Sequence, residues 1–235
     1  MFELLARHIG QITLHRPKAL NAFNHALLDA LAQDLETAKQ QDLRVLIVTG
    51  SGEKAFSAGA DLKERASMSV DETRAFLKKI NLVFDAVANF DVPTIAFING
   101  VAFGGGLELA LACDIRVMAP HAQVGLTECS WGIMPGAGGC IRMPQIVGPA
   151  KAAELIFSAA KISAEECLKI DLVNQIDASP LRLADQIAAC SSLSLKQAKL
   201  ALKTRSESEH YEALLSSPDR LEGLNAFIDK RKPIF

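Results

Sequence analysis

The chain has 235 residues, a formal net charge of −2, and a composition that is 49% hydrophobic and 22% charged. This balance is typical of a soluble globular protein with one medium-sized domain and a sizeable core. The small net charge gives no electrostatic argument for binding to nucleic acid or to an anionic membrane, so neither partner is expected.

Cysteine and histidine residues indicate neither a disulfide framework nor a metal site. The five cysteines include no CxxC pair, and we interpret them as reduced residues, mostly in the core, of a protein in a cytosol-like compartment. The five histidines are scattered, without an HExxH motif. The opening residues MFELLARHIGQITL lack the pattern of a signal peptide. We therefore expect a cytoplasmic protein without a metal ion.

The first half of the chain predicts alternating strands and helices. A strand pattern over 10–14 is followed by the loop HRPKALNAF and by a helix over 24–41. The apolar residues of this helix recur at helical spacing: Leu27, Leu31, Leu35 and Ala38. A buried strand over 45–49 then leads into a loop, AFSAGADL, over 55–62.

A capping box, formed by Ser69 and Glu72, predicts the start of a second long helix that continues to about residue 89. Its apolar face consists of Phe76, Ile80, Val83, Phe84 and Val87. Further strands are expected over 94–98, 115–118 and 123–125. This alternation, which has no sequence repeat, is typical of an α/β fold.

The last third of the chain predicts mostly helices. Ser163 with Glu166 forms another capping box, and the pattern over 221–232 predicts a terminal helix. We therefore divide the chain into an α/β core over 1–175 and a helical region over 176–235 that packs on the core or on another subunit.

The segment INGVAFGGGLELALACD, at 98–114, places three consecutive glycines before an apolar helix. Proline, asparagine and glycine interrupt the apolar run over 92–113, and aspartates rather than basic residues flank it, so we predict no membrane span. The glycine spacing fits neither a P-loop nor a GxGxxG motif, and the chain has no GxSxG motif.

Two loops of small residues could offer free amide groups to a ligand. The start of a helix has unpaired N–H groups, and glycine lets a ligand approach the backbone closely. A second loop, at 57–61, leaves a buried strand in the same way. One amide from each loop could bind a single developing oxyanion.

Two carboxylates have both an ordinary and a catalytic interpretation. Glu108, in the first turn of its helix, could simply offset the helix dipole, and Glu128, in GLTECSWG, could be an ordinary turn residue. If they meet in an apolar setting, burial raises their pKa values and repulsion separates them, which suits general acid–base catalysis. The spacing alone does not show whether they meet.

Five segments, in this order, resemble the crotonase, or enoyl-CoA hydratase/isomerase, superfamily: RPKALNAF (16–23), AFSAGADL (55–62), INGVAFGGGLELALACD (98–114), GLTECSWGIMPGAGG (125–139) and DRLEGLNAFIDKRKP (219–233). The resemblance implies a spiral of strand-strand-helix turns with a C-terminal helical region used in trimerisation, often as a dimer of trimers. It also implies an acyl-CoA thioester substrate and no separate cofactor, because coenzyme A is part of the substrate.

The resemblance assigns roles to four residues. The backbone N–H groups of Ala60 and Gly105 would bind the thioester oxygen as it becomes an enolate. Glu108 would assist the deprotonation of water that adds to Cβ, and Glu128 would exchange a proton at Cα. Many isomerases in the family keep one acid, so the pair favours an enoyl-CoA hydratase, a hydro-lyase, over a Δ3-Δ2 isomerase or another crotonase-type lyase.

The resemblance also indicates contacts with CoA: Ala58, Ala60, Asp61, Leu62 and Lys63 near the adenine, and Lys18, Ala19 and Leu20 beside the phosphates. Phe227 and Lys230 resemble residues of a C-terminal helix, often a neighbouring subunit's, that covers the nucleotide. The alternatives are a solvated loop lysine for Lys18, a core position for Phe227 and a last-turn cation for Lys230.

The segments GLELALACDIRV and DRLEGLNAFIDKRKP look most like methylglutaconyl-CoA hydratases and their bacterial relatives, some of which bind RNA through a lysine-rich helix. The matching helix here, HALLDALAQDLETAKQQ, has more acidic than basic residues, so RNA binding is not expected. A non-catalytic acyl-CoA or RNA-binding protein is the alternative from a different class. The segment 206–217 is shorter than is usual in the family, which bears on the trimer contact and the acyl pocket.

Overall fold

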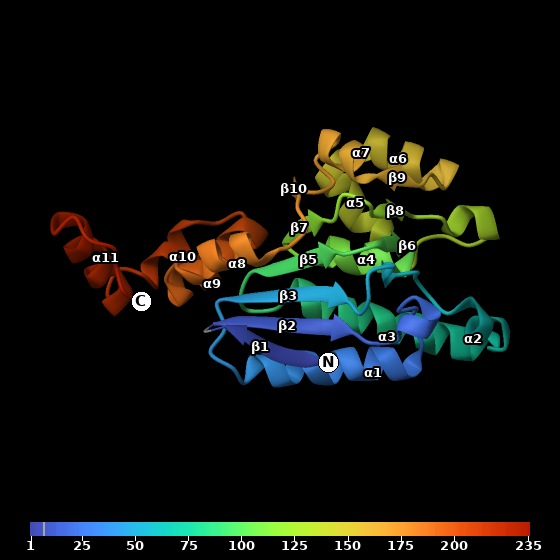
Figure 1. Ribbon diagram of the computed structural model, residues 1–235, viewed down its shortest axis with the longest axis horizontal. Coiled ribbons are helices and arrows are strands. Elements are labelled where there is room, and N and C mark those ends of the chain that lie inside the picture. Colours follow the sequence, from blue (N-terminus) through green and yellow to red (C-terminus); the bar gives the residue numbers. More distant parts are fainter. Residues whose placement is uncertain (7) are drawn as a thin grey trace.

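The structure is a computed structural model that describes residues 1–6 and 8–235, and its strands form two sheets (Figure 1). The strands of the larger sheet are β1 (Phe2–Ala6), β2 (Ile9–Leu14), β3 (Val45–Gly50), β5 (Thr94–Ile98), β7 (Ile115–Met118) and β10 (Gln175–Ile176), adjacent in that order. Those of the smaller sheet are β4 (Ala55–Ser57), β6 (Val101–Phe103), β8 (Gln123–Gly125) and β9 (Ile162–Ser163).

Helices connect the strands and follow them towards the C-terminus. The first six are α1 (His25–Lys39), α2 (Leu62–Ala66), α3 (Val70–Ala88), α4 (Gly105–Ala112), α5 (Gly139–Val147) and α6 (Pro149–Ser158). The later ones are α7 (Ala164–Lys169), α8 (Leu181–Ala188), α9 (Ser192–Thr204), α10 (Ser208–Glu212) and α11 (Pro218–Ile228). Two 3-10 turns, η1 (Pro17–Ala19) and η2 (Glu128–Trp131), lie in loops.

After the first two strands, which both belong to the larger sheet, two successive turns of the chain each contribute one strand to each sheet and then helical structure. Strands β3 and β4 precede α2 and α3, and β5 and β6 precede α4. From β2 to β10 the neighbouring strands of the larger sheet are parallel, whereas β1 is antiparallel to β2. Because parallel strands need a crossover connection, the helix of each turn returns the chain to the same end of the sheet. The strand-strand-helix spiral is confirmed.

The helices that cover the main core follow the predicted patterns. Every apolar residue predicted for the buried faces of α1 and α3 is buried. Both halves of the capping box at the start of α3 are formed, since Glu72 N–H donates to Ser69 Oγ (3.2 Å) and Ser69 N–H donates to Glu72 Oε2 (2.7 Å). The capping box of Ser163 and Glu166 at the start of α7 is formed in the same way.

Several predicted boundaries were wrong for identifiable reasons. The segment AFSAGADL begins with strand β4 rather than a loop, and β1 and β6 were not predicted. The three-residue strands β4 and β6 are too short for a sequence period to develop, and the five-residue β1 is exposed at four positions, so it lacks the alternation of a half-buried strand. The terminal helix begins at Pro218, not at 221, because Ser217 Oγ accepts from Arg220 N–H (3.1 Å) and caps it; it ends at Ile228.

The cysteines are all free, but two of them are not core residues. Cys113 and Cys167 are buried as predicted, and Cys140 is half-buried. Cys129 and Cys190 are exposed. Cys129 lies within the 3-10 turn η2 and Cys190 lies between α8 and α9, where an apolar neighbourhood in sequence does not imply burial.

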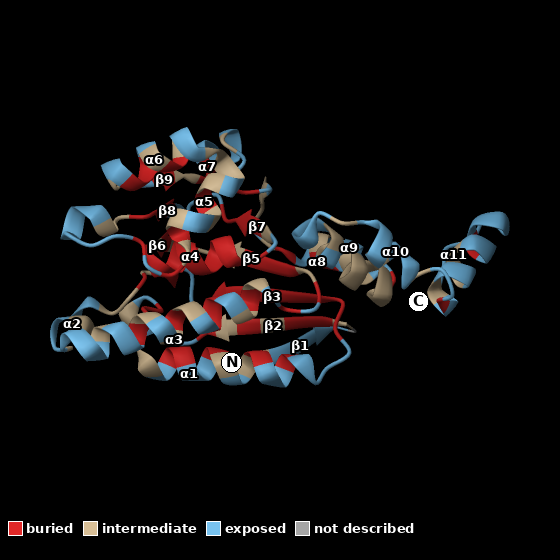
Figure 2. Cartoon of the chain, turned by 180° about the vertical axis from the view of Figure 1, so that it is seen from behind, coloured by how far each residue is buried: buried red, intermediate tan, exposed pale blue. Residues whose placement is uncertain are grey.

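The C-terminal helices differ from the core in burial (Figure 2). Ala184 of α8 is fully buried against the larger sheet, in a cluster with Ile9, Val45 and Val117. Helices α9 and α10 bury no residue and α11 buries only Ala226. These three helices extend to one side of the molecule (Figure 1). Within the described part of the chain, every helix is too short or too polar to cross a bilayer.

Candidate active site

The glycine triplet connects β6 to α4 through a turn that requires glycine. Gly104 has φ 50° and ψ −123°, a conformation in which a side chain is strained. A methyl group at Gly106 would lie 2.2 Å from the carbonyl oxygen of Ser57, so α4 packs directly against β4. The turn therefore places the start of α4 next to the loop that follows β4.

The amide groups of Ala60 and Gly105 lie close together at this junction. A methyl group on Gly105 would be 3.7 Å from the amide nitrogen of Ala60. The loop is fixed on both sides of Ala60, because Phe23 N–H donates to Gly59 O (2.7 Å) and Asp61 N–H donates to Phe23 O (2.8 Å). Neither the Ala60 nor the Gly105 amide donates a hydrogen bond to any other described residue. Two backbone donors are therefore free for one ligand atom.

Glu108 is held by one oxygen in the first turn of α4. Glu108 is only 3% exposed, and its Oε1 accepts hydrogen bonds from the backbone N–H groups of Ala137 (2.7 Å) and Gly139 (2.9 Å). Burial raises the pKa of Glu108, and the two amide donors oppose that effect. Since the described residues donate no hydrogen bond to Oε2, this second oxygen is free to bind a ligand or water.

Glu128 lies at the start of η2 and is held less firmly. Its Oε1 lies against the glycine turn, 2.9 Å from where a methyl group on Gly104 would be. Its Oε2 is buried but has no hydrogen-bond partner within the part of the chain that is described. Burial, together with the charge of Glu108, raises the pKa of Glu128 to about 7. One of the two carboxyl groups therefore changes protonation state near neutral pH.

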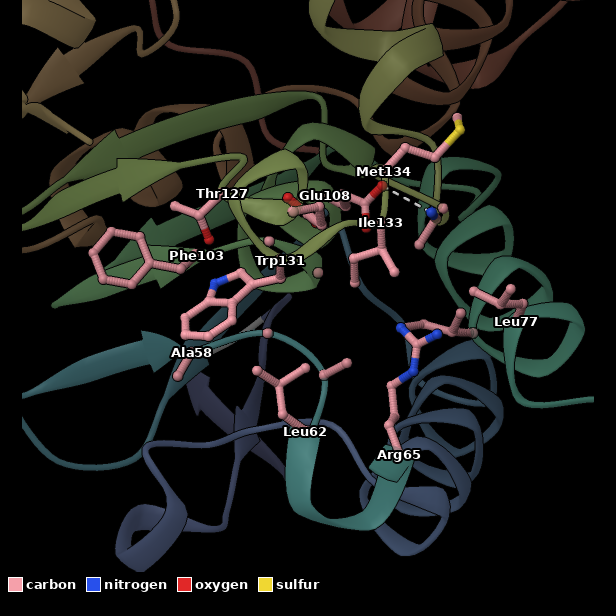
Figure 3. A pocket seen from close by; sticks show the side chains of 18 of the residues that line it. Ala58, Leu62, Arg65, Leu77, Phe103, Glu108, Thr127, Trp131, Ile133 and Met134 are labelled. Atoms are coloured by element: carbon pink, nitrogen blue, oxygen red, sulfur yellow. Dashed lines mark hydrogen bonds between the residues drawn. The ribbon is translucent and has the colours of Figure 1, made fainter. Parts of the chain in front are cut away.

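A cavity of about 790 Å³ brings both glutamates and both amides together. Its further lining is mostly apolar: Ala58, Leu62, Phe76, Leu77, Ile80, Phe103, Trp131, Ile133, Met134 and Ala137. In Figure 3 Ala58 and Phe103 lie at one side of the cavity, Arg65 and Leu77 at the other, and Glu108 between them. An apolar cavity with a few converging polar groups is typical of a small-molecule site.

The residues expected to contact CoA are only partly in this cavity. Ala58, Ala60 and Leu62 line it, whereas Lys18, Ala19, Leu20, Asp61 and Lys63 do not. The loop of Lys18, Ala19 and Leu20 is tied to the same place, because Ala58 N–H donates to Leu20 O (2.9 Å). Lys18 and Lys63 are exposed.

Asp61 has a structural task beside the cavity. It accepts hydrogen bonds from the N–H groups of Lys63 (3.0 Å) and Glu64 (3.3 Å), which caps α2. It also forms an ion pair with Arg16 (2.7 Å), and this contact holds the pKa of the Asp61 carboxyl below its usual value. Its side chain thus fixes the loop that presents the Ala60 amide.

Phe227 and Lys230 lie away from this chain's own cavity, on the C-terminal extension. Phe227 is 84% exposed, so the alternative of a core position is wrong. Lys230 is exposed and follows the end of α11 rather than lying in its last turn. Neither side chain is therefore part of the core of this single chain.

Sequence reasoning missed the residues that hold the glutamate and close the cavity. The PGAGG segment at 135–139 was identified only as part of a segment that resembles the family, without a role of its own, but two of its amide groups bind Glu108. Its signal was a run of small residues whose N–H groups need partners. Trp131, Ile133 and Met134, three partly exposed apolar residues of the cavity wall, had no periodic signal because they lie in a turn and a loop. Among the described residues, no group of His, Cys, Asp and Glu is arranged to hold a metal ion.

Comparison with known proteins gives the same family throughout the chain. A family model described as enoyl-CoA hydratase/isomerase matches residues 5–235. The mitochondrial methylglutaconyl-CoA hydratase of Rattus norvegicus is 38% identical over 259 residues, covering 98% of this chain and 82% of that protein. The enoyl-CoA isomerase/hydratase fer4 of Mycosarcoma maydis is 39% identical over 253 residues, covering 97% and 92%. An enoyl-CoA hydratase structure from Bacillus anthracis has a TM-score of 0.96 at 38% identity, covering 100% and 98%.

Proposed function

Since the chain belongs to the enoyl-CoA hydratase/isomerase family, we propose that it adds water across the 2,3 double bond of a 2-enoyl-CoA to give a 3-hydroxyacyl-CoA. One observation carries this proposal: two glutamates in different environments line the same cavity as two free backbone amides. Hydration needs these groups, because it requires a base for water, an acid for Cα and donors for the enolate oxygen.

The thioester oxygen would bind between the Ala60 and Gly105 amides. Negative charge develops on this oxygen as water adds to Cβ, so donors that are already in place stabilise the enolate more than the substrate. Each donor of this kind is worth roughly 3 kcal/mol in comparable oxyanion holes. The fixed loop on either side of Ala60 supports such preorganisation.

Glu108 would act on water through its free oxygen. Because Oε1 is held by Ala137 and Gly139, Oε2 has a fixed direction from which to accept a proton as the water oxygen attacks Cβ. Glu128, protonated near neutral pH, would donate its proton to Cα. The new bonds are Cβ–O and Cα–H, the C=C double bond becomes single, and proton transfer to and from solvent resets the two acids.

The CoA part of the substrate would lie on the surface formed by two loops. The backbone around Ala58, Asp61, Leu62 and Lys63 would contact the adenine, with Lys18, Ala19 and Leu20 beside the phosphates. The hydrogen bond from Ala58 to Leu20, which joins these loops, supports a single binding surface. No cofactor beyond the CoA of the substrate is part of the proposal.

The same proposal includes assembly into a homotrimer, or a dimer of trimers, in the cytoplasm. Four apolar side chains of α11 are exposed in the single chain: Leu221, Leu224, Phe227 and Ile228. Exposed apolar faces of this kind favour a contact with another subunit. In that contact Phe227 and Lys230 would cover the nucleotide of a neighbouring subunit. Light scattering at several protein concentrations tests the assembly, and a monomer would contradict it.

Hydration of crotonyl-CoA by the purified protein tests the function directly. The absorbance of the conjugated thioester should fall as product forms, and Glu128→Gln should slow that fall by about 10²–10⁴-fold. A 3-enoyl-CoA, in which the double bond must move instead, measures the isomerase alternative in parallel. If wild type shifts that double bond but hydrates neither short nor branched 2-enoyl-CoAs, the hydratase proposal fails.

A further inference from the structure

The loop that binds Glu108 is itself held from α3. Gly136 packs against this helix, since a methyl group on it would be 3.1 Å from Leu77 Cδ2. The side-chain amide of Asn81 donates to the carbonyl oxygens of Leu77 and Gly136, both at 2.7 Å. Asn81 is half-buried, follows the buried Ile80, and lies outside the lining of the cavity. It therefore contacts the loop from behind rather than from the ligand space.

The carbonyl group of Gly136 and the N–H group of Ala137 belong to one peptide unit. Asn81 binds one end of this planar unit, and the other end donates to Glu108 Oε1 (2.7 Å). A hydrogen bond accepted by the carbonyl group polarises the peptide and strengthens the hydrogen bond from its N–H group by about 10–30%. Because the unit is planar, the same contact also fixes the direction of the N–H group. Asn81 can thereby act on Glu108 without touching it.

The second peptide unit that donates to Glu108 is supported by a backbone hydrogen bond. Its N–H group is that of Gly139, and its carbonyl group, that of Gly138, accepts from the N–H group of Arg142 (2.8 Å) in α5. The guanidinium of Arg142 donates to Ala137 O (3.0 Å), which belongs to the peptide unit between the two donating ones. The unit that ends in the Ala137 N–H group therefore depends on a side chain, which a substitution can remove.

We propose that Asn81 is a positioning residue for hydration: through the peptide unit before Ala137 it keeps Glu108 Oε1 in place, so that Oε2 is directed at the water that attacks Cβ. This inference rests on the proposed function for the role of Glu108. A carboxylate bound by a weaker or displaced donor rotates more freely, and a small displacement of a reacting group is costly. A stronger amide donor also favours the ionised form of Glu108, which is the form that accepts a proton from water.

The other charged and titratable groups around Glu108 lie on neighbouring elements. Glu128 is on η2, and Cys140 and Arg142 are on α5. Arg142 is paired in turn with Asp85 of α3 (2.5 Å). A substitution that removes only the side-chain amide on α3 leaves all four groups in place, so a change in the pKa of Glu108 reports the lost hydrogen bond.

NMR spectra of isotope-labelled protein test the contact without an activity measurement. Asn81→Leu removes the donor and keeps the size of the side chain, whereas Asn81→Gln keeps a donor on a longer arm. The amide proton of Ala137 should move upfield in Asn81→Leu, because its hydrogen bond weakens. The amide proton of Gly139 should stay, because its peptide unit is supported by α5. Asn81→Gln should restore part of the shift.

Kinetics with crotonyl-CoA test the consequence for the reaction. In Asn81→Leu kcat for hydration should fall by about tenfold with KM unchanged, because the side chain positions Glu108 but does not line the cavity. The pH below which kcat/KM falls, which reports protonation of Glu108, should rise by about 0.3–1 unit, because the carboxylate loses part of its stabilisation. Asn81→Gln should again lie between wild type and Asn81→Leu.

Lys78→Leu, at an exposed position on the same helix, is the matched control and should leave the rates and both amide signals unchanged. Exchange of the Cα protons of butyryl-CoA in D2O, which the proposed function assigns to Glu128, should persist in Asn81→Leu. An equal loss of hydration and exchange, or an Ala137 signal that does not move, would overturn the proposal. If the Ala137 signal moves as expected but wild type hydrates no 2-enoyl-CoA, the proposed function fails while the link from Asn81 to Glu108 stands.

Discussion

The regions around the two glutamates differ in how firmly they hold a carboxyl group. Glu108 is on a fully buried helix, and one of its oxygens accepts two backbone hydrogen bonds from a segment about thirty residues further along the chain. Glu128 is on a 3-10 turn beside the exposed residues Trp131 and Met134, and its buried Oε2 lacks a hydrogen bond within the described chain.

This difference separates two tasks that are often treated together. A carboxyl group with a fixed direction suits the positioning of water, because a small displacement of the attacking oxygen is costly. A carboxyl group with few hydrogen bonds and a pKa near neutrality suits proton exchange, because both of its protonation states are populated. The same residue type therefore serves two functions through its surroundings.

Removing the fixed carboxylate should have the largest effect. Glu108→Gln keeps the shape of the side chain but cannot accept a proton from water, so kcat for hydration should fall by about 10²–10⁴-fold. Steady-state rates with crotonyl-CoA measure this loss. Glu154→Gln, at an exposed position on α6, is the control and should retain wild-type activity; equal losses in the two variants would show that Glu108 has no special role.

The second-largest effect is expected when α4, the helix that carries Glu108, is separated from β4. Gly106→Ala places a methyl group 2.2 Å from the carbonyl oxygen of Ser57, so the helix must shift, at a cost of about 1–3 kcal/mol in unfolding free energy. Denaturation in urea measures the cost. Gly223→Ala in α11, where the nearest atom would be 3.9 Å away, should be neutral or stabilising. Wild-type stability in the Gly106 variant would contradict the tight packing.

The pH dependence of kcat/KM tests the protonation state of Glu128. Hydration needs a protonated Glu128, so kcat/KM should fall about tenfold per pH unit above an apparent pKa of about 7. Because hydration takes up no net proton, kcat/KM for dehydration of the 3-hydroxyacyl-CoA should fall with pH in the same way. A flat profile through pH 8, or a limb that persists in Glu128→Gln, would assign the titration to another group.

The smallest expected effect concerns stability. Since the pKa of Glu128 is raised in the folded protein, its ionisation costs stability as pH rises from about 4.5 to about 7. Glu128→Gln should therefore be more stable than wild type at pH 8 by about 1 kcal/mol, allowing for solvent screening of this partly exposed group, and the gain should vanish below the unfolded pKa. Thermal unfolding at both pH values checks the sign.

The sequence allowed local features to be predicted better than distant contacts. The buried faces of α1 and α3 and the capping boxes at Ser69 and Ser163 depend on neighbours within a few residues, and all were predicted. Strands β4 and β6, of three residues each, are specified by the sheet they join rather than by their own pattern.

The candidate site shows the same limit. The glycine turn before Glu108 indicated free amide groups. The position of Glu108 in the first turn of its helix, however, was equally consistent with a carboxylate that only offsets the helix dipole. The amides of Ala137 and Gly139 reach Glu108 from a distant segment, and Arg65 enters the cavity from a short helix. Spacing along the chain contains no information on such meetings, so the resemblance to a family, rather than the pattern, paired Glu108 with Glu128.

Proton exchange at Cα tests the division of labour between the two glutamates most directly. Butyryl-CoA, which has no double bond to hydrate, is incubated with each variant in D2O, and the loss of its Cα protons is followed by NMR. Wild type and Glu108→Gln should both exchange these protons, whereas Glu128→Gln should lose the exchange. Undiminished exchange in Glu128→Gln, with its loss in Glu108→Gln, would contradict the roles assigned here.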